Sequence, residues 1–557
     1  MGLDKRMSSR WLPLLVAGGS MASALASGCI GDIGDGEGAG EDPTTTQQAS
    51  CSATADPIRR LTADEYVNTV TALFPGVALP ALSPLPDERV DGFVGHADGQ
   101  SVSSLGVAAY EEMAVDVGEA AATSLGTWAP CTDDSASCLE QIATVLAERA
   151  YRRPLEEVEV SALEAYAAGV HGDYGMQEGA SLVVQAILQS PFFLFRPELG
   201  LAAAPGEAVA ALDDYEMASR LSYFFLDTTP DEALLAAAEA GELTTDAGLI
   251  AQAERLLADE RARPILTGFF AEWLRLYSLD ELALDPATFP ELDDAMRADL
   301  AASARLYLDE VLWQADSYES LVTGHFGYVN DRLAPLFGVD APGTDELVRM
   351  ELPPDERSGV LTQPGLLAST SHGISHSPIY RGVTMLENIL CSKIPAPPPG
   401  ILDDFDPIDV PAEEVCTVRD QIAKTHTVGP DCQGCHAAID GAGFTFESYD
   451  ALGRYRTEEN GCAVDSSGSF PGTLGDVEDA IDMASKLADS EEASSCLVSH
   501  LYRFGLGRSV VEGDTCYVEA IHDAMRDGGG SLQEMVKALV LSPAFRTRPA
   551  PAAQGEN

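Results

Sequence analysis

Apolar side chains recur every three or four residues along most of the chain, which is the spacing of amphipathic α-helices. Alternating, strand-like patterns are sparse, and the helical pattern loosens between 316 and 480. The ranges with helical periodicity are 61–73, 103–125, 138–150, 155–169, 178–189, 213–226, 247–274, 294–315, 476–488, 493–505, 515–527 and 531–541. We therefore expect a mainly α protein.

Several of these ranges begin with residues that favour a helix start. Thr62 precedes Glu65 by three positions, as in a capping box. Asp213 or Asp214 can cap the helix that follows it, and Pro154 stands at the entry to 155–169, where its missing N–H costs nothing. These helices are expected to begin close to those residues.

Two distant segments resemble each other. Residues 151–197 and 502–549 both begin with Tyr-Arg, continue as helix, loop and helix, and end with Ser-Pro-x-Phe. Two copies are too few for a solenoid. The resemblance indicates a structural duplication that braces the two ends of the fold, although two alanine-rich helical segments can also resemble each other by coincidence.

The amino terminus has the features of an export signal. Lys5, Arg6 and Arg10 precede a short apolar stretch, Trp11 to Leu25, which is too short to span a bilayer as a mature helix. The stretch ends in Leu-Ala-Ser-Gly-Cys, which resembles a bacterial lipobox with Cys29 as the lipidated residue. An ordinary secretory signal is the alternative. We expect a lipoprotein that faces the periplasm or the cell surface, attached to the membrane through its lipid only.

Shifts in composition divide the chain. Residues 30–50 contain almost no apolar side chains, and the Pro-rich run 395–400 is typical of a rigid linker. The expected division is 1–29 lipoprotein signal, 30–55 flexible tether, 56–200 N-terminal helical block, 201–345 central helical domain, 346–470 loop-rich cytochrome c-like domain, 471–549 C-terminal helical domain and 550–557 tail.

Composition limits the possible partners. The 557 residues carry 89 acidic and 33 basic side chains, a formal charge of −56, and 45% are hydrophobic. The apolar share can fill hydrophobic cores. A chain this acidic does not follow a phosphate backbone, so nucleic-acid binding is excluded as a class. A partner that docks by charge is expected to be basic.

The most specific chemical motif is Cys432-Gln433-Gly434-Cys435-His436. This is C-x-x-C-H, the attachment pattern of c-type haem. Two thiols at this spacing reach the two vinyl groups of one haem edge, and the following histidine ligates the iron. The sequence therefore predicts haem c on Cys432 and Cys435, with His436 as the proximal ligand.

A sixth iron ligand is not singled out by its neighbours. Met483 lies downstream at a distance suited to a small cytochrome, and Met525, Met535, His500 and His426 are further candidates. Met483 also has the neighbours of a core residue. A Met ligand would raise the potential, whereas an open position would favour small-molecule chemistry.

Three alternatives to haem remain open for the C-x-x-C pair. A zinc site would use Cys432, Cys435 and two of Cys416, Cys462 or His426, although structural zinc prefers paired short spacings. A dithiol redox motif needs a β-α-β context, which the sequence does not show. The two cysteines can also form disulfides.

The remaining cysteines indicate a disulfide-bonded protein. Without Cys29, Cys432 and Cys435, eight of the 11 cysteines are left, which suggests up to four disulfides in an exported chain. Pairing by nearest neighbours in sequence predicts Cys131 with Cys138 and Cys496 with Cys516.

Other candidate sites are weaker. His372 and His376 have a metal-ligand spacing, but Gly373 and Pro378 favour a loop in which both histidines are structural. No G-x-S-x-G, G-x-G-x-x-G or P-loop motif is present, so hydrolase and nucleotide-cofactor functions are unsupported. Asp431, Asp440, Glu447 and Asp450 surround the C-x-x-C-H motif in sequence and would lower a haem potential.

The residues after the motif carry a family resemblance. They continue as Ile439 to Phe444, Phe446-Glu447 and Tyr449 to Arg456. The segment is similar to the one that follows C-x-x-C-H in planctomycete and myxobacterial cytochrome c-like surface proteins, built of serial domains of unknown function (the DUF 1592/1588 group). That family usually has Pro where this chain has Gly441. Further matching stretches include RRLTADEYVNTV at 59–70, ILQSPFFLFRPELG at 187–200, LDDYEMASRLSYFF at 212–225, SPIYRGVTMLENILC at 377–391 and FGLGRS at 504–509.

The resemblance covers nearly all of 58–549 and implies an exported, mostly helical, multi-domain protein with one cytochrome c-like segment. Electron transfer at the cell envelope, through a covalently attached haem, is the expected function. The alternatives are a structural or adhesive cell-surface protein with disulfides and no haem, and a haem-dependent oxidoreductase with an open sixth position.

Overall fold

The computed structural model describes residues 51, 57–201, 209–395, 415–425 and 430–549, without the side chains of 430–433. Within these residues the protein is mainly helical, as predicted, and its strands are short and pair only two at a time. The expected signal, Cys29, most of the tether, most of the Pro-rich run and His426 lie outside the described residues.

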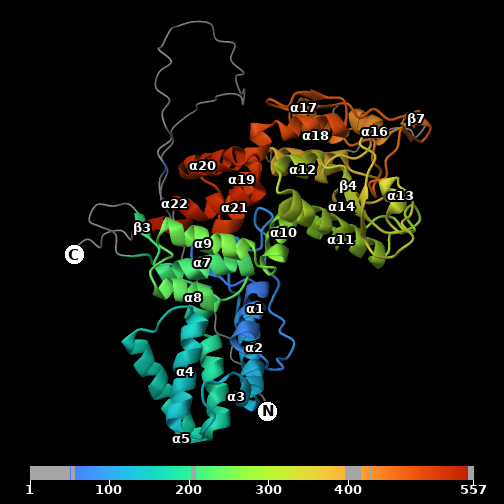
Figure 1. Cartoon of the computed structure of the whole chain (residues 1–557). Coiled ribbons are helices and arrows are strands. Elements are labelled where there is room, and N and C mark those ends of the chain that lie inside the picture. The colour runs from blue at the N-terminus through green and yellow to red at the C-terminus, as the bar shows by residue number, and fades with distance from the viewer. Residues whose placement is uncertain (1–50, 52–56, 202–208, 396–414, 426–429, 550–557) are drawn as a thin grey trace, which may run out of the picture. The chain divides into compact units, whose positions relative to one another are not determined.

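The N-terminal block is a set of helices closed by a small strand pair. Helix α4 packs along α5, and α5 along α2, around a hydrophobic core of their own (Figure 1). The elements are β1 (Arg59–Arg60), α1 (Ala63–Leu73), α2 (Ser104–Thr123), α3 (Leu125–Trp128), α4 (Ala136–Tyr151), α5 (Glu157–Leu188), α6 (Pro191–Leu194) and β2 (Phe195–Arg196).

The rest of the described chain is built around a larger core. Its first part comprises β3 (Val209–Ala211), α7 (Asp214–Leu226), α8 (Glu232–Glu239), α9 (Asp246–Leu257), α10 (Ala262–Trp273), α11 (Asp294–Glu310), a π-helix η3 (Val311–Ala315), α12 (Tyr318–Thr323), β4 (Phe326–Val329), α13 (Ala334–Phe337) and β5 (Val348–Glu351). Apolar side chains of α7 to α12 lie in this core. A smaller core lies beneath β4 and α13.

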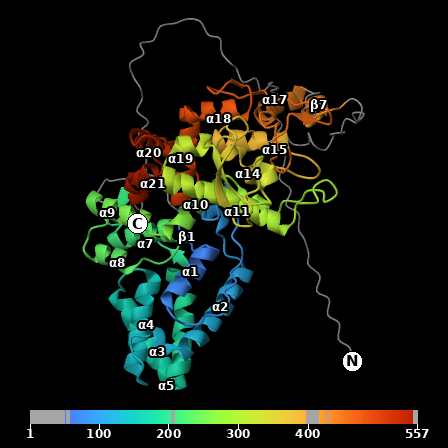
Figure 2. The same cartoon turned by 45° about the vertical axis from the view of Figure 1, so that its right-hand side comes forward.

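The second part of this larger body returns to the elements that began it. Helix α21 lies beside α9 (Figure 2). Strand β10 pairs with β3. The elements are α14 (Pro364–Ser369), α15 (Pro378–Val383), a π-helix η5 (Thr384–Ile389), α16 (Val418–Thr425), α17 (Pro430–Phe444), β6 (Glu458–Glu459), β7 (Cys462–Ala463), β8 (Gly468–Ser469), β9 (Asp476–Val477), α18 (Ala480–Ala488), α19 (Glu491–Leu506), α20 (Thr515–Asp527), α21 (Leu532–Leu541), α22 (Pro543–Arg546) and β10 (Thr547–Pro549).

Most predicted helix starts are confirmed. Thr62 and Glu65 form the expected capping box at α1, and Asp213, rather than Asp214, caps α7 with Glu216. Pro154 was wrongly placed at a helix entry, because α5 begins at Glu157. At this start the Glu159 carboxylate, one turn into the helix, accepts the backbone N–H of Glu156 at 2.9 Å.

Two predicted helix boundaries are wrong. The predicted helices 155–169 and 178–189 form one element, α5, with a kink at Gly175, whose φ is 79°. The predicted helix 247–274 is two helices, α9 and α10. Between them the Asp259 side chain accepts the backbone N–H of Arg261 and turns the chain.

The two similar segments end in the same structure. In the first, Ser190 caps the four-residue α6, and Leu61 N donates to Leu194 O at 2.8 Å beside the antiparallel β1–β2 pair. In the second, Ser542 caps the four-residue α22, and Leu212 N donates to Arg546 O at 2.9 Å beside the antiparallel β3–β10 pair. We call these the first closure (β1, α6, β2) and the second closure (β3, α22, β10).

A buried ion cluster joins the two closures. Glu198, which follows β2, accepts from Arg220 Nε at 2.9 Å and lies 3.8 Å from Arg59 Nη2. Arg220 Nη1 also donates to the carbonyl of Phe545 in α22. Burial would raise the pKa of Glu198, but the guanidinium groups of Arg220, Arg59 and Arg196 outweigh it and lower this pKa to about 2. The carboxylate therefore stays charged between the closures.

The eight remaining cysteines form four disulfides, as the cysteine count indicated. Cys131 pairs with Cys138, as predicted. The predicted Cys496–Cys516 pair is wrong. The observed pairs are Cys391–Cys496, Cys51–Cys516 and Cys416–Cys462. Cys496 lies within α19 and meets the end of η5, whereas Cys516 opens α20, so neighbours in sequence are not neighbours in space.

No helix in the described part of the chain is both long and apolar enough to cross a membrane.

Candidate functional site

The C-x-x-C-H motif lies on helix α17, which the periodicity did not predict. All three residues of the motif fall within this helix, where Cys435 and His436 follow each other directly. Cys435 is half-buried, packs against the larger core, and is a free cysteine. The helix thus presents a thiol next to an imidazole in the order that the motif requires.

His436 is oriented by a carboxylate one turn away. Its Nδ1 lies 3.1 Å from Oδ1 of Asp440, whose residue is only 2% exposed. An acceptor at Nδ1 favours the tautomer with hydrogen on that nitrogen, in which Nε2 carries the lone pair that a metal would use. A carboxylate behind a ligating histidine is a common arrangement at metal sites. The donor set and its support therefore fit a haem iron.

Close backbone contacts hold α17 in place. Gly382 of α15 faces the carbonyl of Ile439, and Gly443 of α17 faces the carbonyl of Pro378, with no room for a Cβ at either glycine. A Cβ at Gly441 would lie 2.7 Å from the carbonyl of Ser469. The glycine at 441, where the resembling family usually has proline, thus fits the close approach of this loop.

A buried arginine fixes the chain after α17. The Arg381 guanidinium donates to the carbonyls of Phe446, Tyr449 and Asp450 at 3.0, 2.8 and 2.7 Å. Burial lowers the pKa of Arg381 to about 10, partly offset by the negative charge of Glu447. The group remains a cation at neutral pH and organises the end of the motif segment.

The two histidines of the preceding loop are held by the protein itself, as expected for structural residues. His376 Nε2 lies 2.9 Å from Oε1 of Glu447, and Arg456 Nη2 approaches Nδ1 at 3.3 Å. Burial lowers the pKa of His376, although Glu447 opposes the shift. His372 is exposed and lies edge-on to Tyr380. Both ring nitrogens of His376 thus face side chains of the protein.

The sixth-ligand candidates lie in or beside the larger core. Met483 of α18 is completely buried, and Met525 and Met535 are buried on α20 and α21. His500 is buried on α19. Whether one of them ligates iron stays a prediction.

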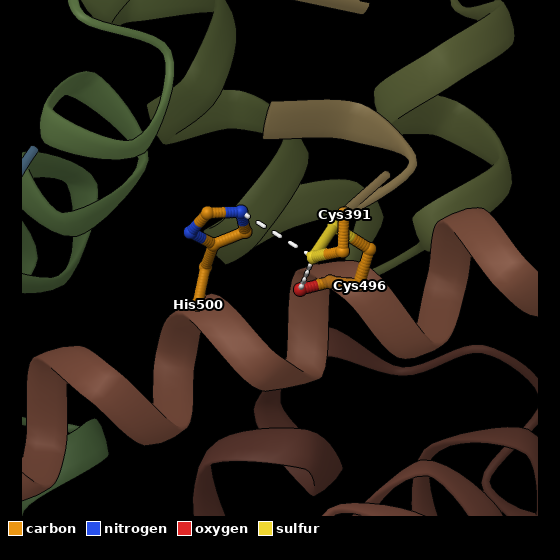
Figure 3. A group of neighbouring side chains, drawn as sticks. All are labelled: Cys391, Cys496 and His500. Carbon is orange, nitrogen blue, oxygen red and sulfur yellow. Dashed lines mark hydrogen bonds between the residues drawn. A yellow bond between two sulfur atoms is a disulfide. The ribbon is translucent and has the colours of Figure 1, made fainter. Parts of the chain in front are cut away.

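The zinc alternative loses two of its ligands. Cys416 and Cys462 are bonded to each other, so neither can supply a thiolate. Within the described residues, two groups bring three potential ligand atoms within 4.8 Å of one another: Cys391, Cys496 and His500, and Cys131, Asp133 and Cys138. In both groups the sulfurs form a disulfide, and Figure 3 shows the one between Cys391 and Cys496. Neither group offers metal-binding thiolates.

A cavity of about 1190 Å³ with many charged residues in its lining lies away from the motif, among α1, α7, α10 and α11. Many of its charges pair with each other, as Arg89 with Glu272 at 3.0 Å and Arg263 with Asp309 at 2.6 Å. One oxygen of Glu272 is buried without a hydrogen-bond partner among the described residues, and burial raises the pKa of this carboxyl. Sequence reasoning missed the cavity because its lining residues are far apart in the chain and form no motif.

Five family profiles match the chain, each described as a protein of unknown function. They are DUF1587 at 59–123, DUF1595 at 138–198, DUF1592 at 212–339, DUF1588 at 357–459 and DUF1585 at 475–545. The DUF1588 range contains both the C-x-x-C-H motif and the His376 loop. No curated protein and no solved structure matches the chain.

Proposed function

Because the chain belongs to the multi-domain group built of these serial domains of unknown function, we propose that it is an exported lipoprotein that carries one c-type haem and transfers electrons at the cell envelope. Haem would be attached through Cys432 and Cys435 and ligated by His436. When bound, it supplies reversible one-electron redox chemistry.

The observation that carries this proposal is the support behind the motif. Asp440 holds His436 from Nδ1, and the free Cys435 stands beside it on the same helix. The four disulfides are consistent with an oxidising compartment, where covalent haem attachment takes place. Lipidation at Cys29 rests on the sequence alone. The charge of −56 favours a basic redox partner whose docking weakens with salt.

One finding argues against the alternative of a structural or adhesive surface protein without haem. It expected Cys432 and Cys435 in disulfides, but Cys435 is a free cysteine. The oxidoreductase alternative differs from electron transfer only in the sixth iron position.

Covalent haem attachment can be tested directly. The mature chain is produced in a host with c-type maturation, and the Soret band is measured after denaturation. We expect a covalent band that the double variant Cys432→Ala/Cys435→Ala loses and the control Cys131→Ser/Cys138→Ser keeps. A colourless protein would contradict the proposal. Spectra of the reduced protein with and without carbon monoxide then distinguish a six-coordinate carrier from an open site.

The role of Asp440 is tested by Asp440→Asn. We expect this variant to keep the covalent Soret band, because the thioether attachments are untouched. Its midpoint potential should become more positive, because a negative charge beside the proximal histidine is removed. An unchanged potential would show that Asp440 does not act on the iron.

A further inference from the structure

The Cys391–Cys496 disulfide has an unusual neighbour. Cys391 follows η5 and is half-exposed, whereas Cys496 and His500 lie one turn apart on α19 and are 2% and 4% exposed. The His500 ring points at the disulfide, with Nε2 3.7 Å from Sγ of Cys391 (Figure 3). One sulfur is thus within reach of solvent while the other lies beside a buried imidazole.

The tautomer of His500 follows from Arg503. Its Nη1 lies 3.4 Å from Nδ1 of His500, and a guanidinium can only donate, so Nδ1 accepts and the ring hydrogen is on Nε2. Burial, reinforced by Arg503 and only partly offset by the Asn388 carbonyl, lowers the pKa of His500 to about 3, so the ring is neutral. An N–H therefore faces the disulfide. The same tautomer disfavours a metal ligand at Nε2.

An N–H donor beside a disulfide favours its reduction. The leaving group of thiol–disulfide exchange is a thiolate, and a thiol of lower pKa leaves faster. A ring nitrogen of His500 lies within 4.8 Å of both sulfurs, and Nε2, 3.7 Å from Sγ of Cys391, can donate to a thiolate formed there. Cys391 also has a left-handed backbone with a φ of 49°, a conformation that costs energy in a non-glycine residue. Opening the disulfide would allow this residue to relax.

The Cys131–Cys138 disulfide provides an internal contrast. Its neighbouring group is the carboxylate of Asp133, with ligand atoms again within 4.8 Å. A negative charge disfavours a thiolate, whereas an N–H donor stabilises it. The two disulfides are therefore expected to differ in how easily they are reduced.

We propose that Cys391–Cys496 is a site of thiol–disulfide exchange with an external dithiol. One thiolate of the dithiol attacks Sγ of the partly exposed Cys391, the Cys391–Cys496 bond breaks, and Cys496 leaves as a thiolate that takes a proton. A mixed disulfide now joins Cys391 to the first sulfur of the dithiol. The second thiol of the dithiol loses its proton, attacks that first sulfur, and releases Cys391. The dithiol becomes a disulfide, and its two electrons and two protons end on Cys391 and Cys496.

The order of reduction tests the proposal in the whole chain. The protein is equilibrated with graded ratios of reduced to oxidised dithiothreitol, and freed thiols are alkylated and identified by peptide mass spectrometry. We expect Cys391 and Cys496 to be half-reduced at a ratio about tenfold lower than Cys131 and Cys138. Equal or reversed order would overturn the proposal.

Two variants separate the imidazole from the rest of the structure. His500→Phe removes the N–H and should raise the ratio for half-reduction of Cys391–Cys496 about tenfold, whereas His500→Gln keeps a donor and should stay near the wild-type ratio. The matched control Asp133→Asn should ease reduction of Cys131–Cys138 only. Helical circular dichroism verifies folding. If His500→Phe does not fold, the wild-type order of reduction still decides.

Discussion

The first and second closures have the same construction but enclose very different lengths of chain. In each, a short strand leads into a helix that begins with a capping box. Further along the chain, a short helix that begins with Ser-Pro leads into a second strand, which pairs with the first. The first encloses only the N-terminal helices, whereas the second encloses every other described element, including α17. The difference shows that this supersecondary unit can enclose chain segments of very different length, provided that its two strands still pair.

The largest expected effect comes from the phenylalanine inside each closure. Phe193 and Phe545 occupy equivalent positions and are completely buried. Phe193→Ala and Phe545→Ala should each lower the free energy of unfolding by about 3–5 kcal/mol, because each leaves a cavity. Urea unfolding followed by circular dichroism measures both.

Phe192 is the matched control, because it lies on the same turn as Phe193 but is 43% exposed. Phe192→Ala should cost much less than Phe193→Ala. A negligible loss in only one of the two buried variants would show that the closures are not energetically equivalent.

A smaller effect is expected from the ion cluster between the closures. The pKa of Glu198 is about 2 in the folded protein against an ordinary 4.5, so its contribution is fully present above pH 4.5 and is lost as the pH falls through 2. The wild type should lose about 3 kcal/mol more stability over this window than Glu198→Gln, which has no carboxyl to titrate.

Urea unfolding at a series of pH values measures this difference. Glu112→Gln, at an exposed position of α2, serves as the control and should follow the wild-type profile. Parallel profiles for the wild type and Glu198→Gln would rule out a charged Glu198 as the link between the closures.

The smallest effect is expected from the caps that follow β1 and β3. Thr62→Ala and Asp213→Ala each remove the side chain that accepts the third backbone N–H of its helix. Each should cost about 1 kcal/mol in thermal or urea unfolding. Thr71→Ala, within α1 and exposed, should cost almost nothing. Unequal losses of stability for the two caps would show that the helix starts of the two closures are not equivalent.

Local signals in the sequence predicted what local chemistry determines. The capping boxes at Thr62 and Asp213 and the Cys131–Cys138 pair depend on residues within one or two turns, and they are confirmed. The amphipathic pattern also predicted most helices, but it continues across Asp259 and so concealed the break between α9 and α10.

Features that depend on distant contacts could not be predicted. Glycines 434, 441 and 443 lower the helix propensity of α17, and packing against α15 and β8 accounts for Gly443 and Gly441. The partners of Cys391 and Cys516 are 105 and 465 residues away. The motif itself was visible, whereas the support of His436 by Asp440 required the helix that the pattern did not show.

The second closure also sets an order of folding. The first can form once residue 196 has been made, but Arg220 must wait for Phe545, 325 residues later. Such non-local pairing is slow, because a long loop must be ordered before its contacts form. In an exported chain, α17 would remain open to attachment enzymes during this delay. A chain truncated before α22 would lack the Phe545 carbonyl that accepts from Arg220, so the second closure could not form in an incomplete molecule.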